Sequence, residues 1–265
     1  MFITWTSTTE FLINMLKAKN KFIAGKYIIG VDEVGRGPLA GPVTVAAVAL
    51  PRNLKLIDYS PRLKLRDSKK LTQKQREIWA GFIKSQPKIK FAIASVSPKV
   101  LDRINISQAA NLAATRAVAR LMADSKWRMA DCRVLLDGGL YLKNTKHKTQ
   151  NTKTEFKVQN VQTVVKGDEK FPAIMMASIM AKVRRDRYMK KMHKFYPVYG
   201  FDVHKGYGTR LHRDAIKKFG LSEIHRRSFT LWPALPKARR IFSARRQAGV
   251  RHLQICPLSE KHFLE

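Results

Sequence analysis

Cysteine is scarce in this sequence, where Cys132 and Cys256 are the only two among 265 residues. Two thiols are too few for a disulfide framework or for a zinc site with four cysteine ligands. Because Cys132 opens an apolar run, we expect it to be a small buried residue. The simplest environment for such a chain is reducing, and we predict a cytoplasmic location.

Long apolar runs are also missing, and no stretch approaches the roughly 20 residues that a membrane-spanning helix needs. The first residues place Glu10 among apolar side chains and lack the basic start and apolar core of a secretory signal. A short N-terminal helix explains this pattern, and an amphipathic presequence is the alternative. We therefore predict no contact with a membrane.

Acidic residues are few, with 19 Asp and Glu against 52 Lys and Arg and a formal net charge of +33. A chain this basic attracts polyanions without sequence preference, so nucleic acid is the expected partner. Charge alone fits two classes of protein. One is an enzyme that acts on nucleic acid, and the alternative is a non-catalytic basic nucleic-acid-binding protein, for example a ribosome-associated one.

The hydrophobic pattern predicts an α/β fold. Apolar, β-branched segments predict strands at 27–31, 43–50, 90–96, 133–136 and 161–165. Helical spacing predicts helices at 72–84, 105–124, 174–194 and 211–219, the first of them capped by Thr72. Three strands, then a helix, then strands alternating with helices indicate a central mixed sheet flanked by helices.

Two basic segments look peripheral to that fold. Residues 141–157 combine five lysines with Thr, Asn and Gln, which predicts a polar, solvated loop. Residues 231–265 are predicted to be a basic C-terminal extension, partly helical. We divide the chain into a lead segment at 1–20, a main domain at 21–230 that carries the insertion, and a tail at 231–265.

Acidic residues follow three of the predicted strands. They are Asp32 with Glu33, Asp137, and Asp168. In open α/β sheets, ligands bind beyond the carboxyl ends of the strands. If the three strands are neighbours, four carboxylates converge, repel one another and raise one another's pKa. Bound divalent cations relieve that repulsion, and ligands that are all oxygen favour Mg²⁺ or Mn²⁺.

Such a cluster suits phosphodiester cleavage, because two metal ions can activate water on one side and stabilise the leaving oxygen on the other. Each acid also has an ordinary explanation. Asp137-Gly138 is a common turn sequence, Lys166-Gly167-Asp168 a common loop, and Asp32-Glu33 could be a cap or an exposed pair. Their shared position at strand ends is what favours a metal site.

Residues 30–43 read GVDEVGRGPLAGPV and closely resemble the ribonuclease HII family. Further motifs of that family follow in family order, so that the resemblance spans residues 27–229. They are DSKKL at 67–71, DG at 137–138, VVKGD at 164–168, ASI at 177–179, AKV at 181–183, RD at 185–186, YGF at 199–201, HKGYGT at 204–209 and HRRSF at 225–229. The loop Gly35-Arg36-Gly37 resembles the HII branch more than the HIII branch.

The resemblance implies a ribonuclease H-like fold for the catalytic domain at 21–230. It implies that Asp32, Glu33, Asp137 and Asp168 are the catalytic acids and the ligands of Mn²⁺ or Mg²⁺, two ions per site. It implies an endonuclease that hydrolyses the RNA strand of RNA–DNA hybrids and cuts 5′ of single ribonucleotides in duplex DNA. The products would carry a 5′-phosphate and a 3′-hydroxyl, and the roles would be ribonucleotide removal and primer removal.

The loop Gly35-Arg36-Gly37 is where we expect ribose to be sensed. Glycine lets backbone groups approach a sugar closely, and the 2′-hydroxyl distinguishes RNA from DNA. Arg36 is expected to steady a phosphate, with a structural salt bridge as the alternative.

The resemblance also implies that Lys69, Lys70 and Tyr207 bind substrate. The two lysines would hold the nucleic-acid backbone as point charges, and the alternative is a solvated basic pair. Tyr207 would stack on the sugar after the ribonucleotide, and the alternative is ordinary packing.

Three other polar residues in these motifs receive no catalytic role. Asp186 is expected to be a structural or supporting acid, while His204 and His225 either contact phosphate or pack. The chain departs from the family in the separation of Asp137 and Asp168, which the segment 141–157 lengthens. A surface insertion costs little free energy, so it need not displace the acids.

The expected partners are RNA–DNA hybrids and DNA duplexes that contain ribonucleotides. We expect a monomer. The insertion and the tail are predicted to add salt-sensitive affinity for duplexes. Whether the tail also contacts a replication clamp is left open by the sequence.

Overall fold

The structure, a computed structural model, describes residues 26–54, 65–125, 127–143, 145–149, 152–156 and 160–229. The predicted lead segment and tail lie outside these residues, as does Cys256. Cys132 is buried, as predicted. Within the described ranges, no helix is both long enough and apolar enough to cross a membrane.

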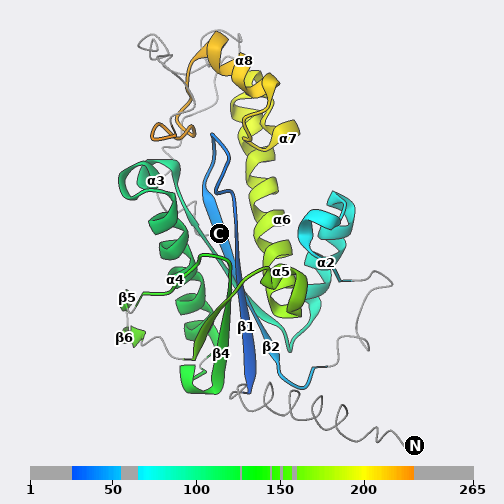
Figure 1. Ribbon diagram of the computed structural model, residues 1–265, viewed down its shortest axis with the longest axis vertical. Coiled ribbons are helices and arrows are strands. Elements are labelled where there is room, and N and C mark those ends of the chain that lie inside the picture. The colour runs from blue at the N-terminus through cyan, green and yellow to red at the C-terminus, as the bar shows by residue number, and fades with distance from the viewer. Residues whose placement is uncertain are drawn as a thin grey trace, which may run out of the picture.

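The centre of the fold is a five-stranded mixed sheet (Figure 1). Its order is β3 (Lys90–Val96), β2 (Val43–Pro51), β1 (Tyr27–Val34), β4 (Cys132–Asp137) and β7 (Val161–Val164). The pairs β1–β2 and β2–β3 are antiparallel, whereas β1–β4 and β4–β7 are parallel. Three parallel neighbours therefore point their carboxyl ends toward the same edge.

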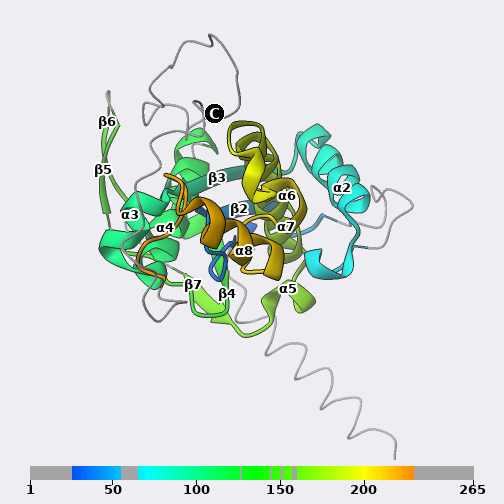
Figure 2. The ribbon, with the colours of Figure 1, turned by 90° about the horizontal axis from the view of Figure 1, so that it is seen from above.

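Helices cover both faces of the sheet, as Figure 2 shows from above. One face carries α3 (Pro98–Ile104) and α4 (Ile106–Ser125), and the other carries α2 (Gln73–Ser85) and α6 (Pro172–Phe195). Half of the buried residues of α4 are alanine, and these small side chains bring its axis close to β2 and β3. The predicted central mixed sheet flanked by helices is confirmed.

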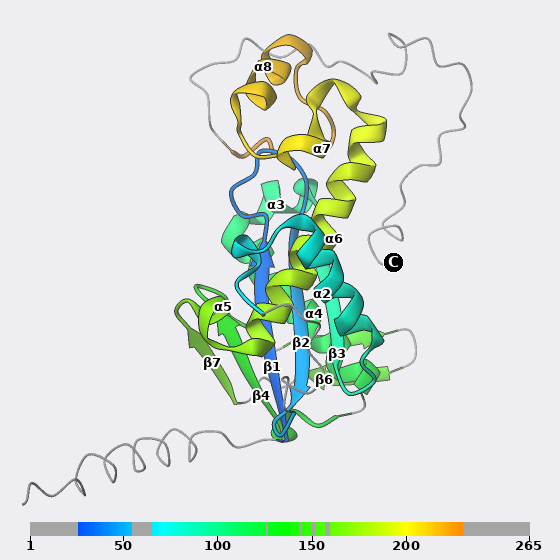
Figure 3. The same cartoon turned by 90° about the vertical axis from the view of Figure 1, so that its right-hand side faces the viewer.

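Beyond the end of the sheet, a separate group of short elements packs on the last turns of α6 (Figure 3). It comprises η4 (Pro197–Tyr199), α7 (Phe201–His204) and α8 (Arg210–Phe219). Apolar and aromatic side chains form a third core there, together with Leu39 and Ala40 from the loop after β1. We call residues 196–229 the C-terminal lobe.

Most predicted elements lie where the pattern placed them, and Thr72 caps α2 through a reciprocal capping box. Strand β1 continues through Val34, so Asp32 and Glu33 lie within the strand rather than after it. The segment 141–157, predicted to be a polar, solvated loop, contains two short strands that the pattern did not show: β5 (Thr145–Thr149) pairs with β6 (Thr152–Phe156). Threonine is frequent in both strands and favours extended backbone.

Candidate active site

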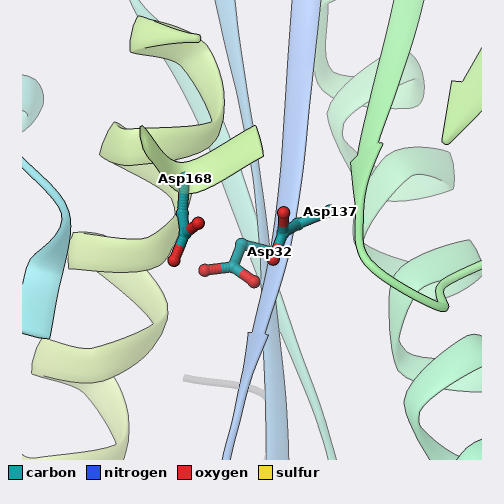
Figure 4. Close-up of side chains that lie close together, drawn as sticks. All are labelled: Asp32, Asp137 and Asp168. Atoms are coloured by element: carbon teal, nitrogen blue, oxygen red, sulfur yellow. The ribbon is translucent and has the colours of Figure 1, made fainter. Parts of the chain in front are cut away.

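Three carboxylates meet at the carboxyl ends of the parallel strands. Strand pairing sets Val31 of β1 opposite Leu136 of β4, so Asp32 and Asp137 follow at neighbouring positions. Asp168 approaches from the segment after β7. Oxygen atoms of Asp32, Asp137 and Asp168 lie within 4.8 Å of one another, and Figure 4 shows the three side chains converging. We call these three residues the acid cluster.

A tight connection after β7 brings Asp168 to the other two. Lys166 adopts the left-handed conformation with φ of 54° and precedes the short helix α5 (Gly167–Lys170). The amide of Gly167 donates to Oδ1 of Asp137 at 2.6 Å. A Cβ at Gly167 would lie 2.5 Å from Cδ1 of Ile174 and 3.2 Å from Oδ1 of Asp137, so a side chain here would require the Ile174 side chain to move. The insertion between the two acids does not separate them in space.

Helix α6 forms the wall behind Asp32. Its first turn lies so close to β1 that a Cβ on Gly30 would be 2.1 Å from the backbone of Ala173. Ser178, which follows later in α6, donates a hydrogen bond to the Asp32 carboxylate. The hydroxyls of Ser178 and Ser68 are 2.7 Å apart, which ties the motif at 67–71 to the same wall.

Burial makes this site unfavourable for unpaired negative charge. It raises the pKa of Asp32 well above the ordinary value, and the charge of Glu33 raises it further. Burial also raises the pKa of Asp137, with the charge of Asp168 adding to the shift. The pKa of Glu33 is raised by burial despite the nearby Arg36 guanidinium. A cation at this point would favour the ionised form of all these groups.

Glu33 was predicted to complete a set of four acids, but it is not among the three that converge. Consecutive strand residues point to opposite faces, and Oε1 of Glu33 instead accepts from Arg36 at 3.3 Å. Its Oε2 is buried and has no hydrogen-bond partner within the described part of the chain. A buried oxygen without a donor costs free energy. A cation bound beside the cluster would remove that cost, so Oε2 of Glu33 is a candidate ligand atom.

The donor set therefore fits divalent metal ions. It consists of carboxylate oxygens alone, which hard cations such as Mg²⁺ and Mn²⁺ prefer. The raised pKa values and the orphaned Oε2 of Glu33 are two independent signs that the charge balance is incomplete without a cation.

Lys69 and Lys70 face acids. Nζ of Lys69 is 3.3 Å from Asp168, and Nζ of Lys70 is 3.3 Å from Glu169. Both ammonium groups are largely exposed, so each pair contributes little stability in water. Their predicted contact with a nucleic-acid backbone stays a prediction.

The two glycines of the predicted ribose-sensing loop differ. Gly35 has φ of 92°, and a Cβ there would lie 2.3 Å from Nε of Arg185. A Cβ at Gly37 would meet nothing within 4 Å. The interior of the protein thus requires glycine at 35, whereas the space beside Gly37 is open. Arg36 forms the salt bridge that was the alternative, to Glu33, and also donates to Ser107 of α4 at 3.3 Å.

Tyr207 lies in the C-terminal lobe with 42% of its surface exposed. Nζ of Lys182 and Cζ of Arg185 are 6.0 and 5.9 Å from the centre of its ring. An exposed aromatic ring beside two cations can receive a sugar next to a phosphate, so the predicted stacking role remains a proposal.

The two histidines and Asp186 are structural in this arrangement. His204 and His225 are buried, and they bond the Tyr199 carbonyl and His212 respectively, at 2.6 and 3.0 Å. Asp186 pairs with Lys182 at 2.9 Å and lies outside the acid cluster. Packing, one of the two alternatives for the histidines, is what the structure has.

Sequence reasoning missed three polar residues around the site: Ser178, Arg185 and Arg226. A serine within the apolar start of a long helix was the available signal for the first. Arg185 and Arg226 stand in the family motifs RD at 185–186 and HRRSF at 225–229, but no local pattern shows that either side chain is buried.

A mixed sheet whose parallel strands deliver carboxylates to one point defines a class, the metal-dependent nucleases with a ribonuclease H-like fold. Comparisons with known proteins narrow the class. The family model described as ribonuclease HII matches residues 29–232. A ribonuclease HII of Hydrogenovibrio crunogenus is 44% identical over 207 residues, which are 78% of this chain and 87% of that protein. One of Bacillus thuringiensis is 43% identical over 203 residues, 77% and 68% respectively.

Solved structures share the fold. A ribonuclease HII of Archaeoglobus fulgidus, from a complex with PCNA, matches with a TM-score of 0.55 and 23% identity over 78% of this chain and 97% of that one. A Bst-RNase HIII in complex with Mn²⁺ matches with a TM-score of 0.57 and 18% identity over 74% and 62%. These likenesses establish the predicted ribonuclease H-like fold.

The chain belongs to the ribonuclease HII family. It is accordingly an endonuclease of the ribonuclease H type, whose substrates are RNA–DNA hybrids and which uses divalent metal ions. Of the two classes that the charge left open, the enzyme is therefore the correct one.

Proposed function

We propose that this endonuclease cuts the RNA strand of hybrids and also cuts 5′ of single ribonucleotides embedded in duplex DNA. The products carry a 5′-phosphate and a 3′-hydroxyl, and the cellular roles are ribonucleotide removal and primer removal. The observation that carries the proposal is the acid cluster, Asp32, Asp137 and Asp168, in a chain of net charge +33. The basic exterior attracts the polyanion, and the acids hold the cations that neutralise its phosphate.

The proposed ligands are the acid cluster and Glu33, which contributes its free Oε2. Two Mg²⁺ or Mn²⁺ ions bound there would lower the pKa of the attacking water and stabilise the charge on the leaving 3′-oxygen. In the reaction a water oxygen forms a bond to phosphorus, the bond from phosphorus to the 3′-oxygen breaks, and that oxygen gains a proton.

The protein's own residues position the substrate. Ser178 and the amide of Gly167 orient Asp32 and Asp137 through hydrogen bonds. Lys69 is close enough to Asp168 to contact a phosphate bound at the cluster.

The open space beside Gly37 supports its assignment as the point where a ribose reaches the backbone. Tyr207 would stack on the next sugar. Selectivity for RNA then comes from contacts to the 2′-hydroxyl, and Arg36 would turn from Glu33 to a phosphate.

The test is a DNA duplex with one ribonucleotide, incubated with Mg²⁺ or Mn²⁺. We expect one cut 5′ of the ribonucleotide, and we expect Asp32→Asn to abolish it while duplex binding is retained. Asp214→Asn is the matched control, because Asp214 is an exposed acid on α8 that pairs with the exposed side chains of Arg210 and Lys217. Intact folded protein that leaves this duplex uncut with either metal refutes the proposal, and near-normal turnover by Asp32→Asn refutes the metal site.

We also propose that the segments at 1–20 and 231–265 flank the catalytic domain at 21–230. The tail and the basic insertion would add salt-sensitive duplex affinity. Deleting residues 231–265 should flatten the salt dependence of binding, and an unchanged slope rules this out.

A contact between the tail and a sliding clamp is part of the same proposal, supported by the PCNA complex of the Archaeoglobus relative. Loss of clamp binding on the same deletion is the expected result, and retained binding contradicts it. A monomeric state and a cytoplasmic location complete the proposal, which sedimentation and fractionation can test.

A further inference from the structure

The loop that carries Gly37 is held from inside the protein by a buried arginine. Only 3% of Arg226 is exposed. Its guanidinium donates to the carbonyls of Gly35 at 2.5 Å, Arg36 at 2.9 Å and Gly41 at 2.9 Å. One side chain therefore fixes both ends of the loop from 35 to 41.

A second buried arginine connects that loop to the turn before Tyr207. Arg185 is fully buried and donates to Ala40 at 2.9 Å, Pro42 at 3.2 Å and Lys205 at 2.8 Å. Its guanidinium also lies 5.9 Å from the centre of the Tyr207 ring. Arg185 thus contacts the two segments that are proposed to grip the ribonucleotide and the following sugar.

Backbone hydrogen bonds join the same segments. The amide of Leu39 donates to Gly206 at 2.8 Å, and the amide of Gly41 donates to Ile224 at 2.8 Å. The amide of Arg226 donates back to Leu39 at 2.8 Å. Three stretches distant in sequence, 35–42, 204–207 and 224–226, form one unit around the two guanidinium groups.

Burying the two guanidinium groups costs free energy, which indicates that they do more than fill space in the core. Burial and the neighbouring charge of Arg185 lower the pKa of Arg226 to about 9. Two buried like charges cost free energy that hydrogen bonds to carbonyls only partly return. Apolar residues of similar volume would avoid the cost of burying charge but would remove these six hydrogen bonds to backbone carbonyls.

We infer that Arg226 and Arg185 are positioning residues that set the spacing between the Gly35–Gly37 loop and Tyr207, and thereby the preference for a single ribose. The inference rests on the proposed function, which gives those two segments their roles. A planar guanidinium presents donors in a fixed fork. A lysine keeps the charge but cannot bond three carbonyls in that geometry.

The experiment compares Arg226→Lys with Arg227→Lys, whose side chain is exposed at the next position. The kcat/KM is measured on a duplex with one ribonucleotide and on a hybrid with an all-RNA strand. An all-RNA strand presents a 2′-hydroxyl at every position at which it can bind, whereas the duplex with one ribonucleotide presents a 2′-hydroxyl at one position. We expect Arg226→Lys to lower the ratio of kcat/KM on the one-ribonucleotide duplex to kcat/KM on the hybrid by about tenfold, because small misplacements of a substrate lower the rate strongly. Arg227→Lys should leave this ratio unchanged.

A merely structural role lowers both rates together, so an unchanged ratio in Arg226→Lys overturns the inference. Amide hydrogen exchange gives a readout that needs no cleavage. We expect faster exchange at Leu39 and Gly41 in Arg226→Lys, with the amides of α4 unchanged. Unchanged exchange at those two amides, or faster exchange everywhere, also overturns the inference. Wild-type protein that fails to cut the one-ribonucleotide duplex refutes the proposed function instead, and exchange still decides the role of Arg226.

Discussion

The acid cluster and the C-terminal lobe both bury ionisable groups, but they treat them in opposite ways. At the cluster, three carboxylates converge, and burial raises the pKa of Asp32. Their neighbour Glu33 has an oxygen that accepts no hydrogen bond from any residue that the structure describes. In the lobe, the buried guanidinium of Arg226 donates to three carbonyls, and His225 bonds His212 and Ser222. Groups left short of partners await a ligand, whereas saturated groups hold architecture in place.

The first test of this comparison is to lower the pH, because the two regions should change the free energy of unfolding in opposite directions. Burial lowers the pKa of His212 to about 4 and that of His225 to about 3. The unfolded chain then binds more protons below the ordinary histidine pKa of about 6.5. The stability that these neutral histidines contribute above that pH is lost as the pH falls. The loss levels off once the pH is below the pKa values of the two histidines in the folded protein. The raised pKa of Asp32 acts oppositely and favours the folded state as the pH falls toward the ordinary carboxyl value.

We expect the histidines to dominate between pH 7 and pH 5, each costing about 2 kcal/mol of unfolding free energy at pH 5. Urea unfolding of metal-free protein at the two pH values measures the loss. His225→Gln should lose about 2 kcal/mol less than wild type over this interval. Equal losses in the two proteins would contradict the assignment of a neutral buried His225.

The second test is to add one methyl group to each glycine of the same loop. Gly35→Ala should lower the free energy of unfolding by about 2 kcal/mol, because of its positive φ and the collision with Arg185. Gly37→Ala should change it by no more than about 0.5 kcal/mol, since the space there is open. Chemical denaturation compares the two, and similar losses would show that the loop is not divided into an inner and an outer glycine. Gly37→Ala should still reduce cutting at a single ribonucleotide if ribose occupies that space.

The smallest expected effect concerns stability without metal. Asp32→Asn removes a buried charge but keeps an acceptor for Ser178, so it should stabilise the metal-free protein by about 1 kcal/mol, as removal of functional strain often does. Wild type should gain melting temperature when Mn²⁺ is added, and Asp32→Asn should gain much less. Asp214→Asn serves as the control and should behave as wild type. A metal-free Asp32→Asn that melts below wild type would mean that no repulsion is stored at the cluster.

How far the sequence alone reaches differs between these regions. Apolar runs ending in Asp137 and Asp168 are local signals, and the expectation that their strands are neighbours is confirmed by the order β1-β4-β7. Thr72 was predictable as a cap because capping depends on residues three apart. The short helices α3, α5 and α7 were missed, since a few residues carry too little periodicity to identify them.

By itself, the sequence determined the layered α/β fold, the acids at the strand ends and the polyanionic partner, because periodicity, residue chemistry and net charge are properties of the chain. Tertiary structure alone decided that the carboxylate of Glu33 accepts from Arg36 and lies beside the group of three rather than within it. It also decided that Gly35 faces Arg185 while Gly37 faces open space. Burial and close approach arise only when distant segments pack, so no spacing along the chain could assign Arg185 and Arg226 their carbonyl partners.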